Sequence, residues 1–208
     1  MKIFPPQATL AMFLRCAAAL GLHLAAAGVR GEAASGGGPV KSWPAEAVIQ
    51  FAGTSTLHDF GGKLAAQPFI LVISNGTWFA TADVLAGEMK TGSDGRDRKM
   101  REMMRAPAHP QIRGSVAPTP LPTTNLLATV IKLKICDTER DLPARVTGWQ
   151  ETPERIQFHA DWELSLEEYG LKPPSVLGVI RVGDRVKLSA DVIARKDPPK
   201  SPVAKPKP

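Results

Sequence analysis

Few residues in this 208-residue chain could carry acid–base or nucleophilic chemistry. The histidines beyond residue 33 are His58, His109 and His159, and they show neither the H-x-H nor the H-E-x-x-H spacing of a metal-dependent enzyme. Residues 53–57 read G-T-S-T-L and lack the second glycine of a nucleophile elbow. Cys136 stands in a polar stretch that predicts an exposed turn. The pattern predicts no catalytic residue, metal site or cofactor, although a metal site built from scattered His and Asp residues stays open.

Three arginines offer binding chemistry instead. Arg96, Arg98 and Arg101 lie close together in the segment T-G-S-D-G-R-D-R-K-M-R-E-M-M-R, which begins at residue 91. A guanidinium group binds a phosphate or carboxylate through two parallel hydrogen bonds, so these side chains are candidates for holding an anionic head group. The alternative is a solvated face on which the arginines pair with neighbouring acids.

The element that best positions side chains spans residues 155–166, R-I-Q-F-H-A-D-W-E-L-S-L. Apolar and polar residues alternate throughout, which is the two-residue period of a β-strand. Side chains on a strand point alternately to opposite faces, so one face must be buried while the other meets water. The buried face would carry the rings of Phe158 and Trp162, and the rest of the chain must close around it.

Similar patterns predict further strands joined by short links. They cover residues 46–51, 66–73, 77–85, 111–116, 127–135, 142–149, 176–182 and 185–195, with a bent or bulged stretch over 53–62. Asn75-Gly76 is a strong hairpin signal, and no helix alternates with the strands, so the sheet should be antiparallel and the fold all-β. About eight strands fit a closed up-and-down barrel or a two-sheet sandwich. The barrel is favoured because closure leaves no exposed edge.

One short helix is expected to interrupt the series of strands. The sequence period changes at residue 93, and a helix through residue 105 places Met100, Met103 and Met104 on one face. These flexible side chains would belong either to a packed core or to a plug over an apolar interior.

The two ends of the chain differ from the body in composition. Residues 1–33 have the basic start, apolar run and small residues of a secretory signal peptide, and the run is shorter than the ~20 residues of a membrane span. Residues 34–45 are predicted to form a linker, and residues 196–208 a disordered Pro/Lys-rich tail. We therefore expect a periplasmic or secreted protein without a stable membrane anchor.

The net charge of +6 lies mainly in these ends. Residues 43–195 contain equal numbers of acidic and basic side chains, so the charge does not predict nucleic-acid binding. Beyond the predicted signal peptide Cys136 is the only cysteine, which excludes an internal disulfide.

Three segments resemble the YceI-like family. They are F-A-G-T-S-T-L-H-D-F-G-G at residues 51–62, the arginine-rich segment continuing through residue 115, and G-V-I-R-V-G-D-R-V-K-L-S-A-D-V at residues 178–192. The resemblance covers residues 46–195. It implies an exported, antiparallel eight-stranded lipocalin-like barrel with one short inserted helix, holding a polyisoprenoid or other long-chain lipid in its lumen.

For such a barrel, the candidate lumen residues are large apolar side chains and the helix methionines. They are Trp78, Met100, Met103, Met104, Ile156, Phe158, Trp162, Leu164, Val186 and Leu188, with Arg96, Arg98 and Arg101 as candidates for the head group. The residues alone fit a packed core equally well. The second hypothesis is therefore a non-catalytic structural or partner-binding barrel that presents residues 118–125 and the lysine-rich tail. The oligomeric state stays open, with a dimer as one option.

Overall fold

The computed structural model describes residues 39–56, 59–173, 175–176 and 180–196. The predicted signal peptide over residues 1–33 lies outside the described residues. So does the predicted tail beyond Lys196.

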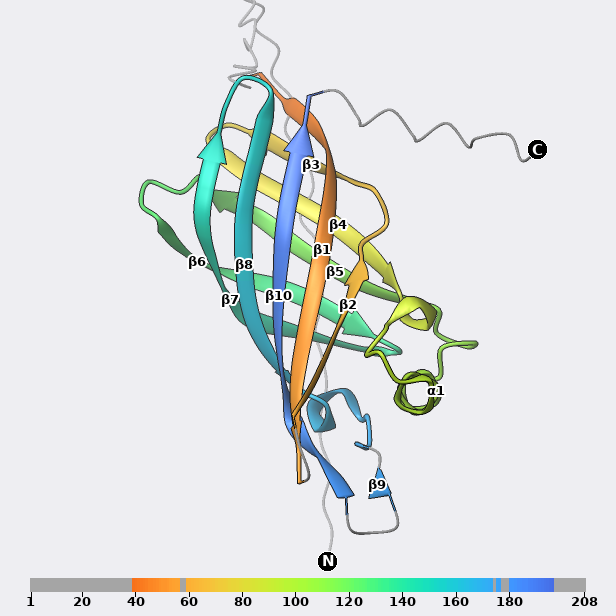
Figure 1. The fold of residues 1–208 in the computed structure, drawn as a ribbon. Coiled ribbons are helices and arrows are strands. Elements are labelled where there is room, and N and C mark those ends of the chain that lie inside the picture. Colours follow the sequence, from red (N-terminus) through yellow and green to blue (C-terminus); the bar gives the residue numbers. More distant parts are fainter. Residues whose placement is uncertain (1–38, 57–58, 174, 177–179, 197–208) are drawn as a thin grey trace, which may run out of the picture. The chain divides into compact units, whose positions relative to one another are not determined.

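Most of the described chain is β-strand (Figure 1). The strands are β1 (Lys41–Ser55), β2 (Phe60–Ala65), β3 (Phe69–Ser74), β4 (Thr77–Leu85), β5 (Gln111–Pro120), β6 (Leu126–Ile135), β7 (Thr138–Glu151), β8 (Arg155–Ser165), β9 (Ser175–Val176) and β10 (Ile180–Arg195). The helices are η1 (Ala86–Glu88) and η2 (Glu167–Tyr169), both 3-10, and α1 (Asp94–Met103), which is inserted between β4 and β5.

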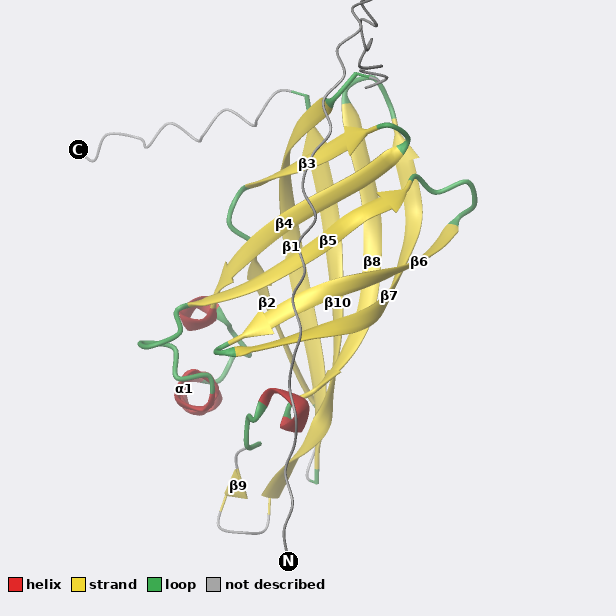
Figure 2. Ribbon diagram, turned by 180° about the vertical axis from the view of Figure 1, so that it is seen from behind, coloured by secondary structure: helices red, strands yellow, loops and turns green. Residues whose placement is uncertain are grey.

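Within the described residues, eight strands close into an antiparallel barrel, seen from behind in Figure 2. Their order is β1, β3, β4, β5, β6, β7, β8 and β10, and β10 pairs back onto β1 from Ala45↔Ala194 to Ser55↔Val182. The short β2 pairs with the second half of β1, and β9 with the beginning of β10. The closure confirms the predicted barrel with one inserted helix and excludes the two-sheet sandwich.

The alternation of residues 155–166 is confirmed by β8. Ile156, Phe158, Ala160, Leu164 and Leu166 are buried, while Trp162 is half-buried. β8 pairs with β10 along its whole length and with β7 along most of it. Because both neighbours hold its backbone, one set of side chains must point into the barrel.

Two hairpins turn through left-handed backbone. Asn75 (φ 51°) and Gly76 (φ 72°) join β3 to β4, as their sequence predicts. Cys136 (φ 52°) and Asp137 join β6 to β7. The prediction that Cys136 is exposed is wrong, because the turn lies beside the end of α1, where the thiol is buried and donates a hydrogen bond to the Met104 carbonyl (3.2 Å).

The strand boundaries differ from the predictions in several places. β1 begins at Lys41, inside the predicted linker over residues 34–45, because Trp43 and Ala45 are buried and pair with β3. β2 forms where a bend was expected and was missed, since its glycines hide the strand pattern. β5 continues to Pro120, and β10 is a continuous strand from Ile180 to Arg195.

The barrel interior contains two apolar clusters. Trp43, Leu71, Trp78, Ile156 and Phe158 belong to one, in which Leu71 and Ile156 have no exposed surface. At this end the rings of Trp78, Trp149 and Phe158 lie 5.0–5.5 Å apart and pack against one another. The other cluster includes residues of α1, the β6–β7 hairpin and the segment after β8. Burial there raises the pKa of Tyr169 to about 12, and its hydroxyl donates to the Leu133 carbonyl (3.3 Å).

Candidate functional site: an apolar cavity in the barrel

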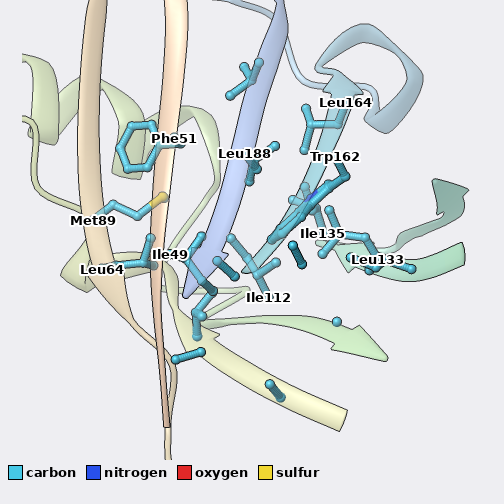
Figure 3. A pocket seen from close by; sticks show the side chains of 18 of the residues that line it. Ile49, Phe51, Leu64, Met89, Ile112, Leu133, Ile135, Trp162, Leu164 and Leu188 are labelled. Carbon is cyan, nitrogen blue, oxygen red and sulfur yellow. The ribbon is translucent and has the colours of Figure 1, made fainter. Parts of the chain in front are cut away.

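Between these clusters the barrel is hollow. A cavity of about 560 Å³ lies inside it, within the ~300–1,000 Å³ range of ligand pockets. In Figure 3, inward side chains from several strands surround a shared space, with Ile49 and Phe51 from β1 facing Trp162 and Leu164 from β8. The interior is therefore only partly filled by its own side chains.

The cavity wall is almost entirely apolar. The large lining side chains include Ile49, Phe51, Phe60, Leu64, Met89, Val84, Ile112, Ile131, Leu133, Ile135 and Leu166. Thr129, Ser55, Ser93 and Ser115 supply the lining hydroxyl groups. With so few polar partners, the wall fits a hydrocarbon chain far better than a polar metabolite.

Two glycines shape the wall where β1 meets β2. Gly53 pairs with Phe60 and Gly62 with Phe51, so each aromatic ring lies over a glycine of the other strand. A Cβ atom on Gly53 would approach the Phe60 ring to 2.7 Å, and one on Gly62 would meet both the Phe51 ring and the Lys90 carbonyl. The absence of side chains at these glycines therefore allows both rings to line the cavity.

The helix α1 contributes Met100 and Met103 to one end of the lining. Met104, directly after the helix, lines the same end. Asp97 fixes the first turn of this helix, because its Oδ1 accepts hydrogen bonds from the Thr91 amide (2.8 Å) and the Thr91 hydroxyl (2.6 Å). The Thr91 hydroxyl lowers the pKa of Asp97, which is buried and stays ionised at neutral pH. The helix is thus tied at its start to the loop that precedes it.

All the charge on the cavity wall lies at this same end. Among the described residues that line the cavity, the charged ones are Arg96, Arg98 and Lys99, with no carboxylate. The Arg98 side chain is 69% exposed, so the cavity reaches the surface here, and its contact with Glu102 is long (3.9 Å). The Arg96 guanidinium carbon lies 5.7 Å from the centre of the Phe60 ring. An apolar chamber with a cationic mouth suits an amphiphile.

The sequence profile of the YceI-like domain matches residues 41–194. The chain belongs to the YceI-like family. A polyisoprenoid binding domain from Saccharophagus degradans, implicated in plant cell wall breakdown, is 12% identical, with a TM-score of 0.52 over 74% of this chain and 98% of that one. BcnA from Burkholderia cenocepacia is 11% identical, with a TM-score of 0.57 over 71% of this chain and 96% of that one. No curated protein sequence matches the chain.

In this YceI-like barrel most of the predicted lumen residues line the cavity. They are Trp78, Met100, Met103, Met104, Phe158, Trp162, Leu164, Val186 and Leu188. Ile156 is the exception: it is fully buried among the side chains of the packed end and does not reach the cavity. Arg96 and Arg98 line the cavity, whereas Arg101 does not. Contact of any of these residues with a ligand stays a prediction.

Sequence reasoning missed most of the wall. Ile49 and Phe51 alternate within a predicted strand, as do Ile131, Leu133 and Ile135, so strand period alone could have found them. Leu64 and Met89 carried no such signal, because β2 was not predicted and Met89 lies in the connection after η1.

The two described histidines, His109 and His159, make separate contacts. His58 lies outside the described residues, His109 faces Asp137 (3.6 Å), and His159 is on the outer face of β8 between Asp191 (2.7 Å) and Asp161 (3.2 Å). In the described ranges no three His, Cys, Asp or Glu side chains are grouped so that they could hold a metal ion. None of the helices in the described part of this YceI-like chain has the length and hydropathy to span a membrane.

Proposed function

We propose that this protein is an exported, non-catalytic carrier that binds one long apolar lipid inside its barrel. The observation that carries the proposal is the cavity of about 560 Å³, whose wall is apolar except for four hydroxyl groups and the cations at one end. The cavity disfavours the alternative of a structural barrel with a solid core.

The wall can supply enough free energy for tight binding without specific polar contacts. Burial of apolar surface contributes about 0.8 kcal/mol per methylene, so ten methylenes contribute about 8 kcal/mol before the cost of association. A net free energy of about 8 kcal/mol corresponds to micromolar affinity, so a chain of well over ten methylenes is needed to offset the cost of association as well. Because methionine is unbranched and polarizable, Met100, Met103 and Met104 can adapt to chains of different shape.

The ligand class follows from the two ends of the cavity. A chain in the apolar part would leave a phosphate or carboxylate beside Arg96 and Arg98, whose guanidinium groups bind such anions through paired hydrogen bonds. A polyisoprenoid is the ligand suggested by the family resemblance and by the description of the Saccharophagus degradans relative. A fatty acid also combines a long apolar chain with an anionic head group.

Export to the periplasm or medium belongs to the same proposal. It is supported by the signal-like composition of residues 1–33. A carrier in an aqueous compartment between membranes would need such a chamber, since long-chain lipids do not dissolve in water.

Native mass spectrometry of the protein purified from an exporting host tests the proposal. We expect a stoichiometric lipid, identified after solvent extraction. Trp162→Arg should abolish its copurification, because a charge would then face the apolar wall. The matched control is Glu163→Ala, the next residue on β8, whose side chain faces outward to Arg185 (3.2 Å).

Equal lipid content in the two variants would contradict the assignment of the cavity as the binding site. A bare mass that stays unchanged after polyprenyl lipids and fatty acids are offered would overturn lipid binding itself. The structural or partner-binding barrel would then be the better hypothesis.

A further inference from the structure

β5 and β6 separate along part of their length. Their ladder contains only the pairs from Arg113↔Lys134 to Val116↔Ile131, although β5 continues to Pro120 and β6 begins at Leu126. Beyond the ladder each strand keeps its other neighbour, since Thr119 pairs with Trp78 of β4 and Leu126 with Thr147 of β7. We call the unpaired part, residues 117–120 of β5 and 126–130 of β6, the β5–β6 seam.

Two prolines in this part of β5 disfavour a longer ladder. Pro118 and Pro120 have no backbone N–H and cannot donate to β6. In place of a ladder, the Thr119 and Thr129 hydroxyl oxygens lie 3.3 Å apart across the seam. The Thr119 hydroxyl already donates to the Ala117 carbonyl (2.8 Å), so its oxygen accepts the hydrogen bond from Thr129. A single neutral side-chain bond bridges the wall at this point.

The seam has apolar surface on both sides. Inside, Thr129 of the seam lines the cavity, next to Val116 and Ile131 of the last ladder pair. Outside, Leu126 is 56% and Val130 is 50% exposed, on the face of β6 that points away from the barrel. A hydrocarbon chain that passed between the strands would therefore leave apolar side chains outside, Leu126 and Val130, and reach apolar side chains inside, Val116 and Ile131.

We propose that the β5–β6 seam is a side portal through which the chain of the bound lipid enters and leaves the cavity. The inference rests on the proposed function, because it requires that the cavity bind a lipid. The head group would stay near Arg96 and Arg98 while Thr119 and Thr129 separate and the chain slips in sideways. Passage through the seam breaks one hydroxyl bond and no ladder bond.

A reversible crosslink across the seam tests the portal. Thr119→Cys with Thr129→Cys should form a disulfide, in a Cys136→Ala background that leaves no other thiol among the described residues. The probe is cis-parinaric acid, a fluorescent fatty acid, and transfer from the protein to excess phosphatidylcholine vesicles is followed by stopped flow. We expect transfer at least ~10-fold slower in the oxidised than in the reduced form of the same protein, since a closed gate limits exchange. Affinity should stay unchanged, because both binding and release are slowed.

The control crosslink joins positions 128 and 145, which pair across the continuous β6–β7 ladder and do not line the cavity. Its oxidation should leave transfer unchanged. Thr119→Val removes the bridging hydroxyl without any crosslink and should speed transfer. Equal transfer by the oxidised and reduced seam variant would overturn the portal and assign exchange to the mouth beside α1. Failure of the reduced protein to bind the probe would instead count against the proposed function, and with it the portal.

Discussion

Arg96 and Arg101 are both on α1, but only Arg96 lines the cavity. Replacing Arg96 and Arg98 by Gln should weaken binding of a long-chain fatty acid by about tenfold or more, because hydrogen bonds to charged groups contribute about 1.5–3 kcal/mol. The alcohol of the same chain length should lose little affinity, since it carries no charge. Titration calorimetry with the two ligands measures both effects.

Arg101→Gln is the matched control for the arginine pair. It removes one positive charge, half of what the double change removes, from the same helix without altering the cavity wall. If Arg101→Gln weakened fatty-acid binding as much as the double change, the effect would be one of net charge and the head-group assignment would be wrong.

His159 stabilises the fold only where it is protonated. The hydrogen bond to Asp191 raises the pKa of His159 above its ordinary value of 6.5, with Asp161 assisting from the other ring nitrogen. A raised pKa means that the stabilisation is fully present below about pH 6.5 and is lost as pH rises through the folded-state pKa. We expect a small effect, because the side chain is 37% exposed.

Urea unfolding at a series of pH values checks the His159 prediction. The free energy of unfolding should decline on the alkaline side of pH 6.5, and the decline should be absent in His159→Gln. An NMR titration in which Asp191→Asn left the His159 pKa unchanged would contradict Asp191 as the cause of the shift.

At the scale of elements, α1 depends on a buried carboxylate. Asp97 accepts both Thr91 hydrogen bonds, so Asp97→Ala should release the start of the helix and speed hydrogen exchange of the Thr91 amide. The exposed Asp94 of the same turn provides the control, since Asp94→Ala removes a charge without these bonds. Exchange at Thr91 that is equal in the two variants would contradict the anchoring role.

The same carboxylate gives α1 a defined response to acid. The Thr91 hydroxyl lowers the pKa of Asp97 below 3.8, so the stabilisation is present above that value and is lost as pH falls through the folded-state pKa. Loosening of α1 should therefore appear only in strongly acidic solution, well below the range in which His159 titrates.

Elements with a clear period could be predicted from the sequence. β8 was predictable because it separates water from the barrel interior, and that difference forces every second residue to be apolar. β2 was not, because Gly61 and Gly62 carry no hydrophobic signal, and the need for them appears only once the Phe51 ring lies across the strand pair. The alternation in a sequence indicates which face of a strand a residue occupies. It does not indicate which side chains lie opposite that face.

The candidate site shows the same limit. Ile156 and Phe158 share one face of β8, yet Phe158 lines the cavity while Ile156 is enclosed in the packed end. Apolar residues are required both by a solid core and by a hollow one, so composition cannot separate the two. Arg96 and Arg101 could not be distinguished either, since their roles depend on how α1 lies against the barrel.

At the scale of the whole molecule, a ligand in the cavity should stabilise the folded barrel. A ligand that binds only the folded barrel stabilises it by about 2.7 kcal/mol at a free concentration 100 times its dissociation constant. Thermal unfolding with increasing fatty acid should therefore show a rising Tm for the unaltered protein. Trp162→Arg should show no such rise, and an equal rise in both would mean that the ligand binds elsewhere.

The rings of Trp78, Trp149 and Phe158 pack together at the end of the barrel interior, in the apolar cluster that does not include α1. If a head group is held at Arg96 and Arg98, the distance from these arginines to the rings limits how many carbons of the chain fit inside the cavity. Shorter chains would leave empty space above the rings, and longer chains would have to leave their surplus outside. Chain length, more than chemical identity, would then decide which lipids this protein selects.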